Sequence, residues 1–348
     1  MASTTAAPKS KRAVSEWLTG QNIVIAVILL IALWRYLVNP VTTTAVLAST
    51  IRQSTPLVLG AICGLLGERS GIINIGIEGQ MLMAAFAGFL ANVYIGNLGI
   101  FPLGITLALA TLIGVAAGAL LGAFLAFMSV TLKMDQIIGG TVINILALGL
   151  TSFFYQAGLT TQGKFQPIDL GFLAKIPLIG PVLFNNPPIT YVTIILVFVV
   201  HYTLFHTKWG LRTRAVGEHP GAADTVGINV HKLRYLNVTI AGAVAGLAGA
   251  FLTLESVGSF ERGMTNGRGF VALAVMLFGK RTPFGAWGAA LLFGFATALQ
   301  TQLQFGGKVN IPHQFIGMLP YLLTIFVLAG FVGRTRDPKA LGQVYETE

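Results

Sequence analysis

The sequence predicts an all-α polytopic membrane protein of about ten transmembrane helices, by the length rule for apolar membrane-spanning segments. Of the 348 residues, 54% are hydrophobic and only 10% are charged, whereas a soluble domain carries about 25% charged residues. Apolar runs long enough to cross a bilayer recur along the chain. Two similar stretches, each interrupted by glycines, also predict an inverted-topology repeat with broken helices. The net charge of +10 does not indicate nucleic acid, because the basic residues cluster in short loops, as the positive-inside rule requires.

The elements follow in order from the amino terminus. Residues 1–20 are polar and basic and predict a cytoplasmic tail, residues 21–333 predict the transmembrane domain, and residues 334–348 predict a cytoplasmic C-terminal tail. The first run is expected to be an uncleaved anchor rather than a signal peptide, because its leader is long and no convincing cleavage site follows. The eighth run is short enough to be a half-helix. The apolar runs are 21–38, 42–66, 75–95, 100–128, 137–155, 189–204, 236–254, 270–278, 284–303 and 315–331.

Basic loops set the predicted orientation. "KSKR" precedes the first run, "FHTKWGLRTRAVGEHPGAADTVGINVHKLRY" separates the sixth from the seventh, and "GRTRDPK" follows the last. An even number of spans places all three on one side, which is the cytoplasm. Both termini and the loop 206–235 are therefore expected in the cytoplasm and residues 156–188 outside. The chain is expected to be a multi-pass protein of a bacterial cytoplasmic (inner) membrane.

The internal repeat joins two stretches that begin with Glu-Arg. "ERSGIINIGIEGQMLMAAFAG" starts at Glu68, and "ERGMTNGRGFVALAVMLFG" starts at Glu261. Each continues with an asparagine, spaced glycines and a small-residue apolar run. An odd number of predicted spans separates the two starts, which places them on opposite faces of the membrane. This arrangement is typical of inverted repeats whose broken helices face each other at the midplane.

Polar residues at the first break are candidates for a translocation path. A broken helix leaves backbone groups unpaired, and only protein or a water-filled cavity can satisfy them inside a membrane. Glu78 is the one acid within an apolar run, whereas Asp135 and Glu255 only flank theirs, so Glu78 is expected to face the interior. The alternative is that these side chains make interhelical hydrogen bonds with no role toward a cargo. The candidates are Asn74, Glu78, Gln80, Gln136, Asn144 and Asn266.

Small residues recur in two apolar runs at the spacing of one helix face. "GVAAGALLGAF" begins at Gly114 and "AGAVAGLAGAF" at Ala241. Because lipid supplies no hydrophobic force between helices, small residues allow the close backbone approach that holds them together. These runs therefore predict tight helix packing.

The loop between the sixth and seventh runs predicts a short docking helix. In "GEHPGAADTVGINVHKL" a helix can start after Pro220, carry Ala222 and Ala223, and end at Gly227 in a left-handed cap. Such a helix projecting from a cytoplasmic loop suits contact with a partner, and the alternative is a solvated basic loop.

These residues carry a resemblance. Ala-Ala-x-x-x-Gly in a cytoplasmic loop resembles the coupling helix of binding-protein-dependent ABC importer permeases. The fuller pattern has a glutamate directly before the alanines, whereas here Gly221 stands there and Glu218 lies three residues earlier. "ERSGIINIGIEGQMLMAAF", "DQIIGGTVINILALGLTSF", "GRGFVALAVMLFGKRTPFGAWGAALLFG" and "LPYLLTIFVLAGFVGRTRDPKALGQVYE" are similar to the nucleoside and simple-sugar permeases of the branched-chain amino-acid and ribose permease superfamily. Within that family they are most similar to the second permease of nucleoside importers.

The resemblance implies a translocation subunit that works with other chains. It implies a second permease subunit as a heterodimeric partner, a cytoplasmic ATP-binding subunit and an external substrate-binding lipoprotein, in a lipid bilayer and without nucleic acid. The ATPase-coupling residues it implies are Glu218, Gly221, Ala222, Ala223 and Gly227.

Motifs for catalysis are missing from the sequence itself. Each Gly-Lys pair lacks the Ser or Thr that a P-loop requires next, so ATP-Mg is expected on the partner subunit, with no cofactor in this chain. The single Cys63 and five histidines without paired spacing give no metal site. The chain is therefore not expected to be an enzyme by itself.

Two other classes of membrane protein share some of these features. A secondary transporter also uses inverted repeats, but it would normally place several ionisable groups in its spans. An intramembrane enzyme would need a catalytic constellation that the sequence lacks. The expected cargo is a nucleoside or related small polar solute, with a simple sugar as the other choice.

Overall fold

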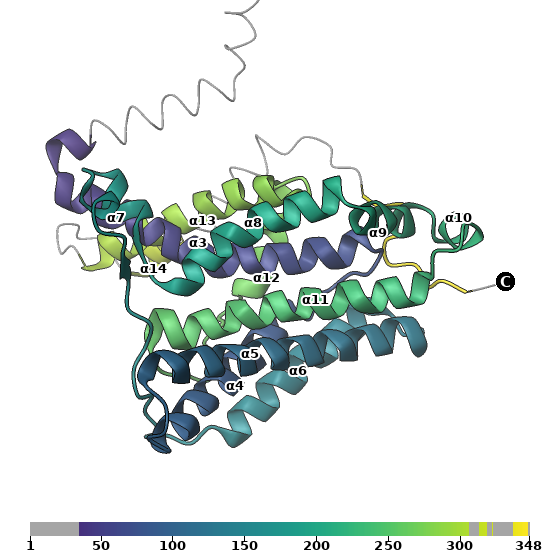
Figure 1. The fold of residues 1–348 in the computed structure, drawn as a ribbon, viewed down its shortest axis with the longest axis horizontal. Helices are drawn as coiled ribbons and strands as arrows, with labels where there is room; N and C mark the ends of the chain where they lie inside the picture. Colours follow the sequence, from purple (N-terminus) through teal and green to yellow (C-terminus); the bar gives the residue numbers. More distant parts are fainter. Residues whose placement is uncertain (1–34, 306–312, 319–321, 323–336, 347–348) are drawn as a thin grey trace, which may run out of the picture.

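The structure is a computed structural model that describes residues 35–305, 313–318, 322 and 337–346 (Figure 1). In this part of the chain, seven helices are long and apolar enough to cross a membrane. The predicted first and last spans lie almost wholly outside the described residues, so the count of ten stays a prediction. The long helices are α3 (Pro40–Arg69), α4 (Ile77–Asn97), α5 (Leu103–Ala126), α6 (Gln136–Phe154), α8 (Pro188–His206), α11 (Val230–Ala250) and α13 (Pro283–Phe305).

The remaining elements are short. The π-helical turns η1 (Phe127–Thr131) and η3 (Phe251–Val257) extend α5 and α11. The helix α12 (Arg268–Phe278) has 11 residues, about 16 Å of rise, which confirms the predicted half-helix. The others are β1 (Ile168–Asp169), η2 (Leu173–Lys175), α7 (Ile179–Leu183), β2 (Asn185–Asn186), α9 (Lys208–Glu218), α10 (Pro220–Thr225) and α14 (His313–Gly317).

Local sequence explains where the helices begin. Asn39 accepts a hydrogen bond from the Thr42 N–H at 3.3 Å, and Pro40 supplies the fixed φ that suits the first residue of α3. Asp135 accepts from the N–H of Ile137 at 2.8 Å at the start of α6. Side-chain oxygens thus satisfy helix N–H groups that have no partner within the helix.

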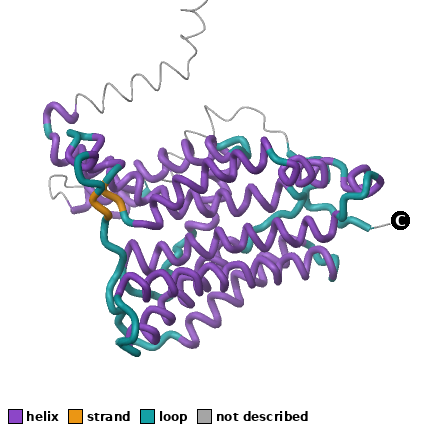
Figure 2. The backbone as a smooth tube through the Cα atoms, viewed as in Figure 1, coloured by secondary structure: helices purple, strands orange, loops and turns teal. Residues whose placement is uncertain are grey.

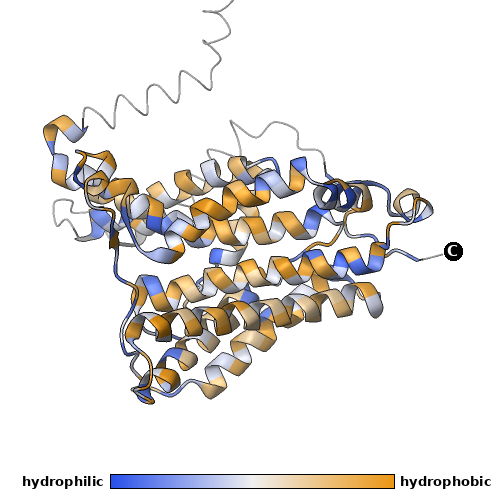
Figure 3. Ribbon diagram, in the orientation of Figure 1, coloured by the Kyte–Doolittle hydropathy of each residue, from blue (hydrophilic) through white to orange (hydrophobic). Residues whose placement is uncertain are grey.

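The long helices lie side by side with α12 among them, and the other short elements lie toward the two ends (Figures 1 and 2). The helices α9 and α10 and the C-terminal residues 337–346 lie at one end. At the other end lie α7 and the antiparallel pair of β1 and β2, in which Ile168 faces Asn186. Hydrophobic residues dominate the long helices, whereas α9 is hydrophilic (Figure 3). We refer to these two ends as the α9–α10 end and the β-pair end.

The centre of the bundle is built on glycine contacts between α5 and α11. A Cβ added to Gly118 would lie 2.5 Å from the Cα of Gly246, and one added to Gly246 would lie 2.8 Å from the carbonyl oxygen of Gly114. Real Cβ atoms do not approach backbone so closely, so these positions require glycine. The two small-residue runs singled out in the sequence therefore pack against each other, which confirms the predicted tight packing.

The two breaks start at opposite ends of the bundle. The first, residues 70–76 between α3 and α4, meets the C-terminal segment, where the Gly342 N–H donates to the Gly71 carbonyl at 3.0 Å. The second, residues 258–267 between η3 and α12, meets the loop before β1, where Thr161 donates a short hydrogen bond to the Gly258 carbonyl. This is the arrangement expected from the inverted repeat.

Candidate functional site

The first break is held by two amide side chains of α6. Gln136 Oε1 accepts from the Ile73 N–H at 2.7 Å. Asn144 uses both ends of its amide: Nδ2 donates to the Ile75 carbonyl at 3.1 Å, and Oδ1 accepts from the Gly79 N–H at 2.8 Å. The unwound backbone is thus paired with protein side chains, as a membrane interior demands.

Glu78 joins the two breaks. Its Oε1 accepts from the Gly267 N–H at 2.8 Å and its Oε2 from the Gly269 N–H at 2.6 Å. Both donors belong to the start of α12, where the partial positive charge of the helix favours an anion. A Cβ on Gly269 would lie 2.6 Å from the Glu78 Cα, so glycine is needed for this approach. The carboxylate of one broken helix therefore caps the other.

Asn74 and Gln80 form a small buried polar cluster with Cys63. Asn74 Nδ2 lies 3.1 Å from Gln80 Oε1 and 3.4 Å from Cys63 Sγ. Asn74 is 1% exposed and Gln80 is fully buried, and each amide keeps one atom without a hydrogen-bond partner. Their observed contacts are interhelical or within the break, which fits the alternative of a structural role.

Asn266 stands apart from the other candidates. It lies in the second break with a positive φ of 45°, and its side chain is exposed. Five of the six path candidates thus converge on the first break, and Asn266 does not join them. Whether any of them contacts a cargo stays a prediction.

Glu255 is a buried acid that the sequence did not mark as a candidate. Its Oε2 accepts from the Ile189 N–H at 2.6 Å, and its Oε1 accepts from the Thr190 N–H at 3.1 Å. Glu255 therefore caps α8 as Glu78 caps α12. The sequence feature that could have identified Glu255 is its position at the end of an apolar run, because a buried acid there needs hydrogen-bond donors.

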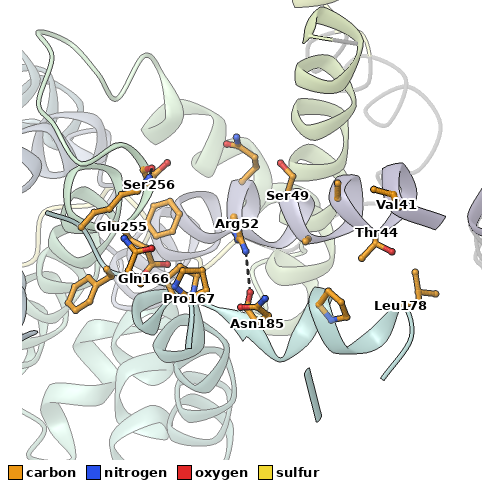
Figure 4. Close-up of a pocket in the computed structure, with 18 of the residues that line it drawn as sticks. Val41, Thr44, Ser49, Arg52, Gln166, Pro167, Leu178, Asn185, Glu255 and Ser256 are labelled. Atoms are coloured by element: carbon orange, nitrogen blue, oxygen red, sulfur yellow. Dashed lines mark hydrogen bonds between the residues drawn. The ribbon is translucent and has the colours of Figure 1, made fainter. Parts of the chain in front are cut away.

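A pocket of about 900 Å³ with polar and apolar walls lies at the β-pair end (Figure 4). Arg52 crosses it and donates through Nη2 to the Asn185 carbonyl at 3.1 Å. Glu255 and Ser256 close one side, and Gln166 follows from the loop before β1. The volume is within the range of small-molecule sites, about 300–1,000 Å³.

The wall that α3 gives to this pocket mixes small apolar residues with polar ones. Most of its lining residues recur three and four apart, which is one face of a helix; they are Pro40, Val41, Thr44, Ala45, Ala48, Ser49, Arg52 and Gln53. Such residues in a membrane helix face the protein interior or a water-filled cavity rather than lipid. Ser49 brings a hydroxyl and Gln53 an amide to this wall. The pocket can therefore bind a solute through hydroxyl and amide groups.

The predicted docking helix is present as α10. Its cap is a Schellman motif: the Gly227 N–H donates to the Asp224 carbonyl at 2.8 Å, and the Ile228 N–H donates to the Ala223 carbonyl at 3.1 Å. Gly227 has φ +82°, which confirms the predicted left-handed cap. Gly221 and Ala222 are exposed, so the helix presents one face to solvent.

Ala223 packs within its own chain. It is 3% exposed and belongs to a cluster with Val216 and Val230, so it holds α10 against the rest of this chain, and its role in contact with an ATPase stays a prediction. Two adjacent residues of a helix point about 100° apart, and only the packing shows which one faces out. Glu218 is exposed, and its Oε2 accepts from the Lys339 N–H at 3.4 Å.

Val226 is an exposed apolar residue beside α10 that the sequence did not mark as a candidate. It is 74% exposed at the end of α10. A valine so exposed on a hydrophilic end is a candidate anchor for a partner, because apolar contact area drives most protein association. Among the described residues there is no cluster of three or more His, Cys, Asp or Glu that could hold a metal ion.

Comparison with known proteins adds the family. Residues 46–328 match the family described as the permease component of the branched-chain amino acid transport system. The guanosine ABC transporter permease protein NupQ of Bacillus subtilis is 40% identical over 312 residues, which covers 86% of this chain and 96% of that protein. The nucleoside ABC transporter permease protein NupC of Lactococcus lactis is 38% identical over 310 residues, with 86% and 96% covered. The guanosine ABC transporter permease protein NupP of Bacillus subtilis is 30% identical over 295 residues, with 82% and 81% covered.

Proposed function

Because this chain belongs to the branched-chain amino acid transport system permease family, we propose that it carries a nucleoside across the membrane as one subunit of an ABC importer. The similarity to the guanosine and nucleoside permeases over most of the chain carries this proposal. The partners are a second permease subunit, an ATP-binding subunit that holds ATP-Mg, and an external binding lipoprotein.

The pocket chemistry supports a small polar cargo. A nucleoside needs hydrogen-bond partners for its base and ribose and an aromatic or apolar surface for the ring. The pocket offers Ser49, Gln53 and Gln166 for hydrogen bonds, and Tyr36 and Phe165 for ring contact. We infer that it receives cargo on the external side, which places the α9–α10 end in the cytoplasm.

Two acids of the helical bundle argue against ion coupling. Glu78 lies inside an apolar run and Glu255 flanks one, and each accepts two backbone N–H groups. A carboxylate so occupied is a helix cap rather than a carrier of protons or sodium ions. ATP hydrolysis by a partner is therefore the proposed energy source, rather than the ion gradient of a secondary transporter.

Uptake of radiolabelled guanosine tests this function. The chain is reconstituted in proteoliposomes with the second permease, the ATPase and the binding protein encoded beside it. We expect uptake only when ATP is present on the side of the membrane that the ATPase faces. Uptake should be lost when the P-loop lysine of the ATPase is substituted. Uptake by this chain alone, driven by an ion gradient, would show that it is a secondary transporter.

The exposed face of α10 is the proposed ATPase contact. We expect Val226→Glu to reduce recovery of the ATPase with the purified complex by about tenfold, since a central apolar anchor contributes about 1–2 kcal/mol or more to an interface. Folding should be unaffected, because Val226 is 74% exposed. The matched control is Val257→Glu, which is 52% exposed and lies before the second break at the β-pair end. Equal ATPase recovery in the two variants would contradict α10 as the docking element.

A further inference from the structure

The C-terminal segment 337–346 is bound to the α9–α10 end by backbone hydrogen bonds. The Gly342 N–H donates to the Gly71 carbonyl in the first break at 3.0 Å. The Ala340 N–H donates to the Gly217 carbonyl at the end of α9, also at 3.0 Å. One short segment thus contacts both the proposed docking loop and the break.

Arg234 holds the first break and the C-terminal segment together from the protein interior. It is 2% exposed, and its guanidinium donates from Nε to the Ser70 carbonyl at 3.2 Å and from Nη1 to the Gln343 carbonyl at 3.1 Å. A rigid fork of donors can join two backbone segments in this way, which a lysine cannot. A Cβ on Gly71 would lie 2.9 Å from the Arg234 Nη2, so the break and the arginine are in direct contact.

Side chains anchor both ends of the segment. Tyr345 donates its hydroxyl to Asp224 Oδ2 of α10 at 2.8 Å. Asp337 pairs through Oδ1 with Arg281 Nη1, in the turn between α12 and α13, at 2.6 Å. Arg281 also forms a short ion pair with Glu68 at the end of α3. The segment therefore contacts α10 at one end and the turn after the half-helix at the other.

An exposed ion pair lies just beyond these contacts. Lys133 Nζ bonds Glu346 Oε1 at 2.5 Å, and this lysine lowers the pKa of the Glu346 carboxyl. Both side chains are largely exposed, so the pair contributes little to the binding of the segment.

We propose that Arg234 and residues 337–346 form a coupling strap, which holds the first break in a fixed position relative to α10. When the ATPase displaces α10, the strap moves the break at 70–76. That break continues into α4, whose Glu78 caps α12, so both broken helices are displaced together. This role rests on the proposed docking of the ATPase at α10.

The test measures guanosine taken up per ATP hydrolysed, in proteoliposomes that contain the full importer. Tyr345→Phe removes only the hydroxyl that reaches α10, and Asp224→Ala removes its acceptor. We expect each variant to lower uptake per ATP by about 5-fold or more, the usual range for a coupling between sites. The double variant should be no worse than the singles, because both remove the same contact. ATPase recovery should not change in Tyr345→Phe, which leaves α10 itself unaltered.

The control is Val344→Ser, in the same segment, whose side chain is 43% exposed. It should leave uptake per ATP unchanged. A chain lacking residues 337–348 should show the same uncoupling as Tyr345→Phe or a larger one; if it does not insert, the point variants decide. Unchanged uptake per ATP in Tyr345→Phe and Asp224→Ala would overturn the strap. Absence of ATP-dependent uptake in the unaltered complex would instead overturn the proposed function.

Discussion

Replacement of Glu78 by leucine is expected to abolish uptake and to lower the thermal stability of the chain in detergent. The leucine leaves the N–H groups of Gly267 and Gly269 without the carboxylate that now accepts them. Each unsatisfied buried donor costs about 1–3 kcal/mol, and the start of α12 also loses its favourable interaction with an anion. The half-helix should then separate from α4.

Glutamine at the same position gives the graded comparison. Its amide has one oxygen, so Glu78→Gln can accept from one of the two N–H groups while its NH₂ faces the other. We expect uptake and the midpoint of thermal unfolding to fall between those of the unaltered chain and the leucine variant.

Glu261→Leu is the control for the Glu78 variants. Glu261 is an exposed acid in the second break, so its loss should leave both the unfolding midpoint and uptake near those of the unaltered chain. The unfolding midpoint is measured by fluorescence-detected size exclusion after heating to a series of temperatures. Uptake is measured with guanosine. An unaltered midpoint and full uptake in Glu78→Leu would show that the cap between the two broken helices is dispensable.

Replacement of Gly118 by leucine should prevent assembly of the bundle. The new Cβ would lie 2.5 Å from the Gly246 Cα, and the contact is helix backbone, which cannot move aside as a flexible side chain does. Overpacking a core costs about 1–3 kcal/mol, occasionally more, and here it separates the two helices that form the centre of the fold. The expected result is a chain that reaches the membrane but elutes as aggregate and takes up no guanosine.

Gly104→Leu is the matched control on the same helix. Nothing lies within 4 Å of a Cβ at Gly104, so the larger side chain should be accommodated, with elution as a single peak and uptake retained. Aggregation of both variants would point to a general effect of leucine in α5 rather than to its contact with α11.

The sequence alone determined the class of protein and most of its elements. The apolar runs between 42 and 303 became helices, because a membrane interior admits few other ways to pair backbone groups. The run 270–278 was short in sequence and is a half-helix in the structure. The end of α10 at Gly227 was predictable as well, because a positive φ strongly favours glycine. These are local properties of a chain in lipid.

The tertiary structure decided which residues meet. The sequence marked Glu78 as an acid that needs donors but could not name Gly267 and Gly269, because contacts between distant parts of a chain depend on the packing of every helix between them. It could not tell Ala222 from Ala223, since burial of one requires Val216 and Val230 opposite it. It treated residues 334–348 as a tail, whereas those of them that the structure describes join α9, α10 and the first break. Nearly every residue type has the same backbone carbonyl and N–H groups. Contacts made by these groups, such as those of residues 337–346, therefore cannot be read from the residue types in the sequence.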